Sequence, residues 1–251
     1  MQIRLLLLFS FCSFSLLSQR DVSTETIGTP WIGIHYGISS PTNSLAERFG
    51  LLNNLGFNAG YKTKRNWFVG TDLNFFFGNQ LKTGDIFTNL QDSYGNISDI
   101  NGDVGTVLLY SRGYNANFSL GKVFPVFGSN PNSGIFLQAG AGYMQYRIRI
   151  ETNNQVIPQV ELDYRKGYDR LTGGLTSHQF VGYAHMSNGG LVNFYAGFYF
   201  LQGYTHNQRT VNFDQPSVPV STSLRYDNLY GFRLGWLIPI YKSKPKEFYY
   251  N

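Results

Sequence analysis

The feature that most constrains this chain is an alternation of large apolar and small polar residues with a period of two. Between residues 111 and 121 the odd positions are serine, glycine or asparagine, and the even positions other than Arg112 are tyrosine, alanine, phenylalanine or leucine. Successive side chains of a strand point to opposite faces, so this period predicts β-strands. Residues 51–62, 67–77 and 224–241 show the same contrast. We therefore expect an all-β fold.

The two faces of these strands predict an inverted arrangement of polarity. Glycine, asparagine and serine cannot build a dense apolar core, whereas the aromatic and aliphatic face is too bulky for the inside of a narrow barrel. The pattern is consistent if the outer solvent is hydrocarbon, where every strand edge must be paired in a closed barrel. The composition agrees, with 17% aromatic and 14% charged residues, against about 25% charged residues in average chains. A helical membrane protein is excluded because no run of about 20 apolar residues is present.

Eight strands are expected in a single closed, antiparallel, up-and-down barrel. Their predicted ranges are 30–39, 51–62, 66–79, 105–121, 134–150, 170–186, 191–204 and 224–241. The connections alternate between short turns and the longer polar segments 40–50, 80–104, 151–169 and 205–223, as in outer-membrane barrels with short periplasmic turns and long extracellular loops. A change of parity near Tyr143 predicts a β-bulge or a shifted boundary in the fifth strand.

The ends of the chain predict export. Residues 1–18 contain Arg4 and an apolar core from Leu5 to Leu17, which is typical of a cleaved signal peptide and too short to span a bilayer. Residues 19–29 then form a short N-terminal periplasmic segment, 30–241 the barrel and 242–251 a basic and aromatic periplasmic tail. The only cysteine, Cys12, lies in the signal segment, so the mature chain needs no disulfide. The expected location is the outer membrane.

The last predicted strand carries a family resemblance. Its segment "RLGWLIPIY" resembles the insertion signal of small outer-membrane β-barrel proteins of Gram-negative bacteria, with Arg233, Gly235, Ile238 and Ile240 at the motif positions. The chain ending and the signal style look most like uncharacterised Bacteroidota members. The resemblance implies contact with outer-membrane lipid and lipopolysaccharide, and handling by the outer-membrane assembly machinery.

Aromatic and basic residues near strand ends indicate where the membrane surfaces lie. Trp67, Trp236 and Tyr241 are expected in an aromatic girdle at the periplasmic side. Trp31 lies near the same side but has inward parity. Arg112 has lipid-facing parity, and its distance from the inner end of its strand places it near the outer interface, where it can reach lipopolysaccharide phosphate.

Polar residues of inward parity are expected to fill the narrow interior, since side chains can fill an eight-stranded barrel. We predict a buried ion pair between Asp72 and Arg233 at similar depth. The surrounding polar network is expected to contain His35, Asn74, Asn115 and Asn117. Two interpretations remain open, a structural plug and a gated polar conduit.

One segment resembles a catalytic motif. In "HMSNGG", His185, Ser187 and Asn188 resemble the His-x-Ser-Asn motif of the lipid A 3-O-deacylases, which are outer-membrane enzymes. A serine–histidine pair needs a group that orients the histidine, but the next predicted strand contains no acid, and Asn193 occupies the matching place. Asn188 and the two glycines after it alternatively predict a tight hairpin turn. We expect strands and a turn, and no catalytic residues.

No other motif predicts chemistry. The histidines lack metal-ligand spacing, no glycine-rich phosphate loop joins a strand to a helix, and no dense basic run predicts nucleic-acid binding. No cofactor and no metal are expected. The leading interpretation is a structural or protein-interaction role in the cell envelope, accessory to a secretion or envelope complex, with a periplasmic or envelope protein as partner. A small-solute channel is the first alternative and a lipid A deacylase-like enzyme the second.

Overall fold

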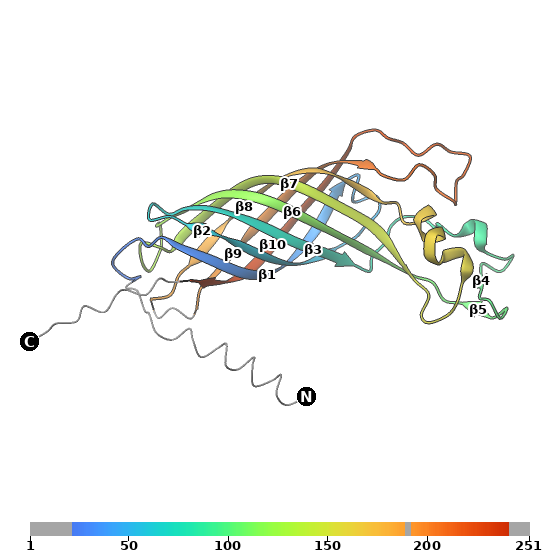
Figure 1. Cartoon of the computed structure of the whole chain (residues 1–251), viewed down its shortest axis with the longest axis horizontal. Helices are drawn as coiled ribbons and strands as arrows, with labels where there is room; N and C mark the ends of the chain where they lie inside the picture. Colours follow the sequence, from blue (N-terminus) through green and yellow to red (C-terminus); the bar gives the residue numbers. More distant parts are fainter. Residues whose placement is uncertain (1–21, 189–191, 241–251) are drawn as a thin grey trace, which may run out of the picture.

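Eight long strands close into one antiparallel barrel in a computed structural model that describes residues 22–188 and 192–240 (Figure 1). The strands are β1 (Thr29–Asn43), β2 (Leu52–Lys62), β3 (Trp67–Gly78), β6 (Leu108–Phe124), β7 (Gly134–Glu151), β8 (Thr172–His185), β9 (Phe194–Asn207) and β10 (Arg225–Pro239). Each pairs with its neighbours in sequence, and β1 pairs with β10 to close the ring. The predicted eight-stranded up-and-down barrel is confirmed. Within the described ranges, no helix combines the length and apolarity needed to cross a bilayer.

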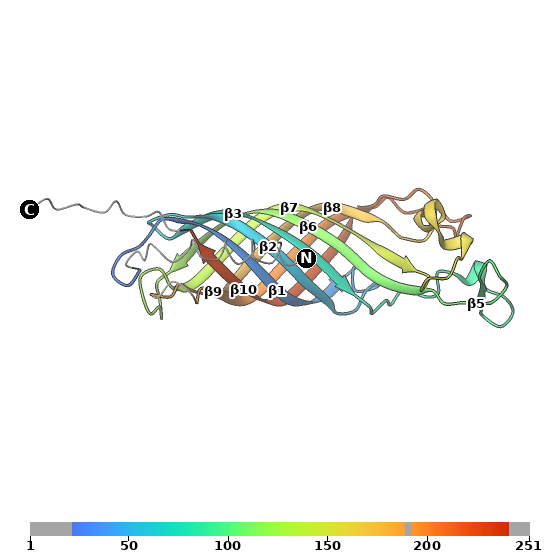
Figure 2. The same ribbon diagram turned by 60° about the horizontal axis from the view of Figure 1, so that its bottom comes forward.

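The two ends of the barrel differ (Figures 1 and 2). The short-turn end carries the connections 63–66, 125–133 and 186–193, together with the start of β1 and the end of β10. The long-loop end carries residues 44–51, 79–107, 152–171 and 208–224. These loops contain structure that the sequence did not predict: the 3-10 helices η2 (Thr88–Leu90), η3 (Pro158–Val160) and η4 (Leu162–Gly167), and a hairpin of β4 (Ile97–Ser98) and β5 (Val104–Gly105).

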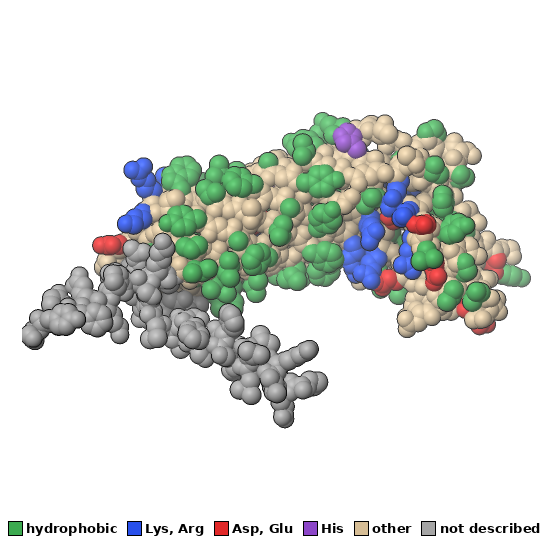
Figure 3. All heavy atoms as spheres, in the orientation of Figure 1, with side chains coloured by type: hydrophobic (Ala, Val, Ile, Leu, Met, Phe, Trp, Pro, Cys, Tyr) green, Lys and Arg blue, Asp and Glu red, His purple; other side chains and the backbone are tan. Residues whose placement is uncertain are grey.

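Large apolar side chains cover the outside of the barrel. Leu73, Phe118 and Trp236 expose 55%, 54% and 53% of their surface, whereas the inward neighbours Asn115 and Ser119 expose 3% and 0%. On the face seen in Figure 3, hydrophobic side chains are spread along the barrel wall, while Lys and Arg gather toward its two ends. The inverted distribution expected from the sequence is therefore present along the strands.

The fifth long strand differs from its prediction. The pairing of β6 with β7 runs without interruption from Leu108 opposite Glu151 to Phe124 opposite Ile135. The prediction of a bulge near Tyr143 was wrong, because the even positions of β7 point inward on both sides of that residue. What changes there is the residue type, since the inward side chains Met144 and Tyr146 lie where the loops cover the lumen.

Some strand boundaries also differ. β1 runs to Asn43 rather than to residue 39, because it pairs with β10 along its whole length up to Asp227. β6 begins at Leu108 and ends at Phe124, three residues later than predicted at each end. β9 begins at Phe194 rather than at residue 191, so the connection after β8 is longer than the tight hairpin expected at the glycines, and Gly189–Leu191 lie outside the described residues.

An aromatic layer fills the lumen near the short-turn end. Its members are inward-facing and almost fully buried: Trp31, Phe68, Phe136, Phe180 and Tyr195. Neighbouring ring centroids are 4.6 Å apart for Trp31 and Phe68, and 5.4 Å apart for Phe180 and Tyr195. This layer, which we call the aromatic floor, separates the centre of the barrel from the short-turn end.

Residues 22–28 cover the barrel below the aromatic floor. Asn132, in the turn between β6 and β7, accepts hydrogen bonds on its Oδ1 from Ile27 N (2.9 Å) and Lys62 Nζ (2.8 Å). Its Nδ2 donates to the carbonyl oxygens of Val22 (3.0 Å) and Glu25 (2.8 Å). One buried amide therefore ties the chain segment before β1 to the β6–β7 turn and satisfies the buried ammonium of Lys62.

Candidate functional site

The centre of the lumen holds an ion pair between β3 and β10. Arg233 Nη1 lies 3.5 Å from Asp72 Oδ1, and each side chain exposes 3% of its surface. Asp72 Oδ2 also accepts hydrogen bonds from Ser119 Oγ (2.8 Å) and Gln138 Nε2 (3.1 Å). The Arg233 guanidinium stacks over the Tyr199 ring, 3.8 Å from its centroid. Both charges are therefore withdrawn from solvent and held by several side chains each.

The other predicted network residues lie around this pair. Asn74 Oδ1 accepts a hydrogen bond from Arg233 Nη2 (3.1 Å) and lies 2.5 Å from His35 Nε2. Gly56 faces this contact, and a Cβ there would lie 2.2 Å from His35 Nε2, so only glycine leaves room for the imidazole. The structure thus brings His35 and Asn74 to the arginine side of the ion pair.

The two remaining predicted asparagines join the network through other residues. Asn115 Nδ2 donates to the Tyr199 hydroxyl (3.4 Å), and Asn117 Oδ1 accepts from Thr176 Oγ1 (2.9 Å). Asn117 stands directly opposite Asp72 in the β3–β6 pairing. Neither asparagine bonds to the charged pair itself among the contacts that the structure shows.

Sequence reasoning missed several members of the lumen network: Ser119, Gln138, Thr176, His178, Tyr195 and Tyr199. His178 Nε2 lies 3.1 Å from Ser119 Oγ. Strand parity contained the signal for Ser119, which follows Asn115 and Asn117 on the same face of β6. The inward position of His178 was not predicted, because glycine and small polar residues occupy both faces of β8 near residues 173–179 and its alternation is weak.

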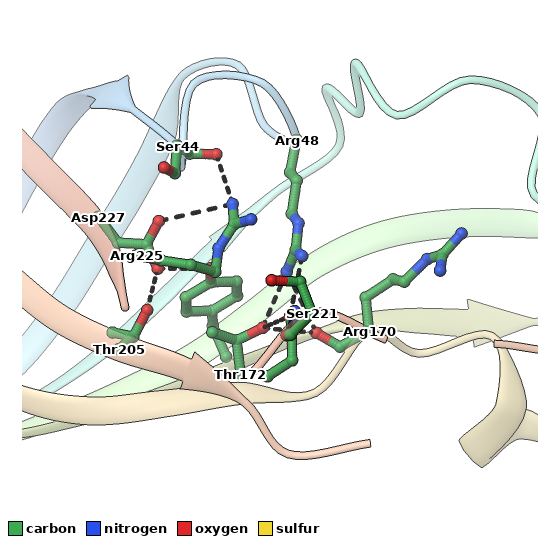
Figure 4. Close-up of polar contacts among 10 residues, drawn as sticks. Ser44, Arg48, Arg170, Thr172, Thr205, Ser221, Arg225 and Asp227 are labelled. Carbon is green, nitrogen blue, oxygen red and sulfur yellow. Dashed lines mark hydrogen bonds and ion pairs between the residues drawn. The ribbon is translucent and has the colours of Figure 1, made fainter. Parts of the chain in front are cut away.

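A second polar cluster closes the barrel at the long-loop end (Figure 4). Asp227, fully buried, accepts hydrogen bonds from the Tyr146 hydroxyl (2.7 Å) and from Thr205 Oγ1. Arg225 Nη2 lies 3.9 Å from Asp227 Oδ1 and donates to the Ser44 carbonyl (2.9 Å). These contacts join β7, β9 and β10 to the loop that follows β1.

Arg48 extends from that loop toward β8 and β9 (Figure 4). Its guanidinium donates to Thr172 Oγ1 (2.8 Å) and Asn207 Oδ1 (3.0 Å). Burial lowers the pKa of Arg48 from its ordinary value, yet an arginine remains protonated at neutral pH. A permanent cation is thus held at the barrel mouth by neutral oxygen acceptors.

Two further ion pairs order the outer loops. Arg209 contacts Asp169 through two hydrogen bonds of 2.8 and 2.6 Å, and the Asp169 carbonyl accepts from Ile148 N in β7. The hydrogen bond to Asp169 raises the pKa of Arg209. Arg170 lies 2.5 Å from Asp214. The long loops after β7 and β9 are therefore fastened to each other.

These loops form a pocket at their tips. Its volume is 440 Å³, and its lining residues are Asn89, Leu90, Pro158, Gln159, Tyr164, Tyr168, Phe213 and Pro216. The rings of Tyr168 and Phe213 meet edge to face, with centroids 5.7 Å apart. Asn89 Nδ2 donates to the Tyr168 hydroxyl (3.0 Å), which orients the amide beside the rings. The pocket is lined by aromatic rings and side-chain amides, and its residues come from the three loops after β3, β7 and β9.

The segment that resembles a catalytic motif lies at the short-turn end. The His185 ring stacks on Phe194, with centroids 5.3 Å apart, and Asn188 Oδ1 accepts from Asn130 Nδ2 (2.9 Å). Among the described residues, no acidic side chain is seen hydrogen-bonded to His185. The Ser187 backbone N–H donates to Asn193 Oδ1 (2.9 Å), so Asn193 holds the connection between the strands. No group of three or more His, Cys, Asp or Glu side chains in the described part of the chain is placed to hold a metal ion.

The structure describes all the predicted girdle and insertion-signal residues except one. Trp67 and Trp236 point outward at the short-turn end, and Lys122 Nζ lies 5.0 Å from the centre of the Trp67 ring. Tyr241 lies outside the described residues. Ile238 and Ile240 are outward and half exposed. Gly235 points inward with Arg233, and a Cβ on it would lie 2.3 Å from the Tyr195 ring.

Fold and interior together define a narrow, eight-stranded antiparallel barrel with an apolar exterior and a filled lumen. Solved structures of similar fold include the attachment invasion locus protein Ail of Yersinia pestis, determined with the heparin analogue sucrose octasulfate (TM-score 0.42, 10% identity, covering 84% of this chain and 98% of Ail). They also include the N-terminal β-barrel domain of Pseudomonas aeruginosa OprF (TM-score 0.37, 10% identity, 84% and 99% covered) and the outer membrane protein OprG of the same organism (TM-score 0.37, 11% identity, 87% and 99% covered). No protein-family model and no curated protein matches the sequence.

Proposed function

We propose that the chain is an integral outer-membrane barrel that serves as a structural or protein-interaction element of a Gram-negative envelope. The observation that carries this proposal is the inverted surface: the outward positions of the strands expose leucine, isoleucine, phenylalanine and tryptophan side chains by about half. An exposed apolar surface of this extent is not tolerated in water by a monomer. A closed barrel satisfies every backbone hydrogen bond between strands, as hydrocarbon requires.

The height of the apolar band supports the same placement. On the outer face of β6, Lys122 and Arg112 bracket an uncharged stretch that includes Phe118 and Leu120. At roughly 3.3 Å per residue and a strand tilt near 40°, this stretch is about 25 Å high, which equals the apolar band of outer-membrane barrels. The short-turn end then faces the periplasm and the long-loop end the cell exterior.

Expression in a Gram-negative host tests this placement. The protein is expected in the outer-membrane fraction, to resist extraction by alkaline carbonate, and to migrate faster on gels before boiling than after. Recovery of folded protein in the soluble periplasmic fraction would contradict the proposal.

The filled lumen favours an interaction role over transport. The aromatic floor and the central ion pair consist of buried inward side chains from six of the eight strands, and the Arg48 and Asp227 clusters close the opposite mouth. A water-filled channel would leave these side chains exposed to solvent. The outer loops, in contrast, are fastened by ion pairs and present an aromatic pocket. Ordered loops of this kind suit binding of a partner in a secretion or envelope complex.

Planar-bilayer recordings separate the two roles. The wild type and Asp72→Ala are both expected to give no steps of conductance, because the aromatic floor and the Arg48 and Asp227 clusters close the lumen on both sides of the central pair. Steady conductance of the wild type would favour the small-solute channel instead. Steps that appear in Asp72→Ala but not in the wild type would show that the central ion pair, and not the aromatic floor, closes the lumen.

Site-specific photocrosslinking in living cells tests the interaction role. A photoreactive residue at Tyr164, which is 61% exposed beside the loop pocket, is expected to give a discrete adduct with an envelope protein. The matched control is Tyr61, which is 49% exposed on the lipid-facing wall near the short-turn end. Identical adduct patterns from both positions, or none from Tyr164, would contradict partner binding at the loops.

A further inference from the structure

Two arginines that form no ion pair among the described residues lie on the outer wall between the apolar band and the long loops. Arg112 on β6 and Arg147 on β7 are direct partners in the strand pairing, and both point outward. Figure 3 shows Lys and Arg side chains gathered between the hydrophobic wall and the loops. Like charges directly opposite each other destabilise a sheet, so this arrangement requires a compensating anion.

No acidic side chain of the described residues forms an ion pair with either arginine. β6 contains no acidic residue, and the only acid of β7, Glu151, lies 2.6 Å from Arg149. Arg112 Nη1 donates to the Ser111 carbonyl (2.9 Å), and its guanidinium packs over the Tyr110 ring at 4.9 Å. These contacts fix the direction of Arg112 without neutralising it. For Arg147, no contact with an acidic side chain is seen among the described residues.

A groove beside the two arginines shows what kind of molecule fits. Its volume is 370 Å³, and its lining residues are Phe75, Arg112, Gly113, Tyr114, Gln145, Tyr146, Arg147 and Leu171. Phe75 and the ring of Tyr114 lie toward the barrel middle beside the Gln145 amide, which accepts a hydrogen bond from the Tyr114 hydroxyl, whereas Arg112 and Arg147 lie nearer the long loops. Guanidinium groups bind phosphate oxygens in a bidentate manner. The ligand must therefore combine a phosphate with apolar chains that run down the barrel wall.

We propose that Arg112 and Arg147 bind the phosphate monoester of an acylated glycolipid in the outer leaflet. A phosphate monoester carries nearly two negative charges at neutral pH, which matches two unpaired arginines, whereas a phospholipid diester carries one. This proposal rests on the outer-membrane placement above and adds a ligand class and two binding residues to it.

Native mass spectrometry of the whole protein in detergent micelles tests the site with purified diphosphorylated lipid A. The Arg112→Gln/Arg147→Gln variant is expected to bind lipid A about tenfold more weakly, because charge-assisted hydrogen bonds are lost. Lys122→Gln, which removes an outward cation at the opposite boundary, is the matched control and is expected to bind like the wild type. Dephosphorylated lipid A, phosphatidylglycerol and inorganic phosphate are the competing probes.

Several results would overturn the site. The site is refuted if the folded double variant binds lipid A as tightly as the wild type does. It is also refuted if the wild type binds dephosphorylated lipid A or phosphatidylglycerol as tightly as diphosphorylated lipid A. Displacement of lipid A by millimolar inorganic phosphate would show that the two arginines take a free ion. Heat-modifiable gel mobility of each variant reports folding. A wild type that never folds in micelles refutes the membrane placement, whereas a folded variant that keeps its lipid refutes only the phosphate site.

Discussion

Replacing Asp72 by asparagine tests the central ion pair most directly. The exchange keeps the side-chain shape and an oxygen that accepts from Ser119, but it leaves the Arg233 guanidinium without its counter-charge. Exposed ion pairs contribute about 0–1 kcal/mol, whereas removing one partner of a buried pair destabilises by about 3–5 kcal/mol. At 3% exposure this pair belongs to the buried class. The hydrogen bond of Arg233 to Asn74 and its stacking on Tyr199 remain, so we expect the lower end, about 3 kcal/mol.

Urea unfolding in detergent micelles, followed by tryptophan fluorescence, measures this change. With a slope of about 2 kcal/mol per molar urea, the midpoint is expected to fall by about 1.5 M. The double variant Asp72→Asn/Arg233→Met is expected to recover most of this loss, because it removes the isolated charge as well. A midpoint of Asp72→Asn within about 0.3 M of the wild type would refute the reasoning, since an arginine that tolerates this loss must already be solvated.

Three further substitutions test other parts of the structure. Asn132→Ala removes four hydrogen bonds of the short-turn end and is expected to destabilise the barrel by about 2–4 kcal/mol, with faster hydrogen exchange at residues 22–28. Gly140 faces the lumen, and a Cβ on it would lie 2.0 Å from a β6 carbonyl. Gly140→Val is therefore expected to lower the urea midpoint strongly, whereas Ala139→Val, at an outward position, is expected to leave the midpoint unchanged. Arg209→Gln breaks the bidentate pair with Asp169 and is expected to make the outer loops sensitive to protease on intact cells.

Ser129→Ala is the control for the short-turn end, because this serine is exposed in the same turn as Asn132. If both variants unfolded at the same urea concentration, the amide would have no role in fastening residues 22–28. A protease-resistant Arg209→Gln would show that the loop contacts other than this ion pair suffice to hold the loops together.

The period-two pattern predicted the fold because strands with a small polar face and a large apolar face leave few arrangements other than a closed barrel with the polar face inside. Inward parity was enough to select Asp72 and Arg233 from strands far apart in sequence, and the structure places them in contact. Parity gives the face on which a residue lies, and its distance from the strand end gives its depth. Neither gives the position of its side chain relative to those of other strands. For this reason parity did not reveal that Tyr199 of β9 stacks on Arg233, or that His178 of β8 reaches Ser119.

The half of the lumen nearer the long loops was less predictable, because side chains from these loops pack against its inward residues. Phe49, from the loop after β1, meets the inward ring of Tyr146 with centroids 5.6 Å apart. The large aromatic ring of Tyr146 therefore faces inward on β7, whereas near the centre of the barrel the inward side chains of the strands are mostly small and polar. The sequence pattern records this change as a loss of parity at Tyr143, although the strand is regular. No local signal in the sequence distinguishes a bulge from a lumen that is filled by a distant loop.

The layered interior explains why a polar core is compatible with a stable barrel. Desolvated charges are tolerated only when partners and further hydrogen bonds surround them, and the central layer supplies both around Asp72 and Arg233. The aromatic floor on one side and the loop-capped apolar residues on the other restrict the entry of water to this layer. Low water content strengthens the attraction between the charges, so closing the two ends and retaining the ion pair depend on each other. A substitution that opens either end, at Trp31 or at Phe49, is therefore expected to weaken the pair at the centre without touching it.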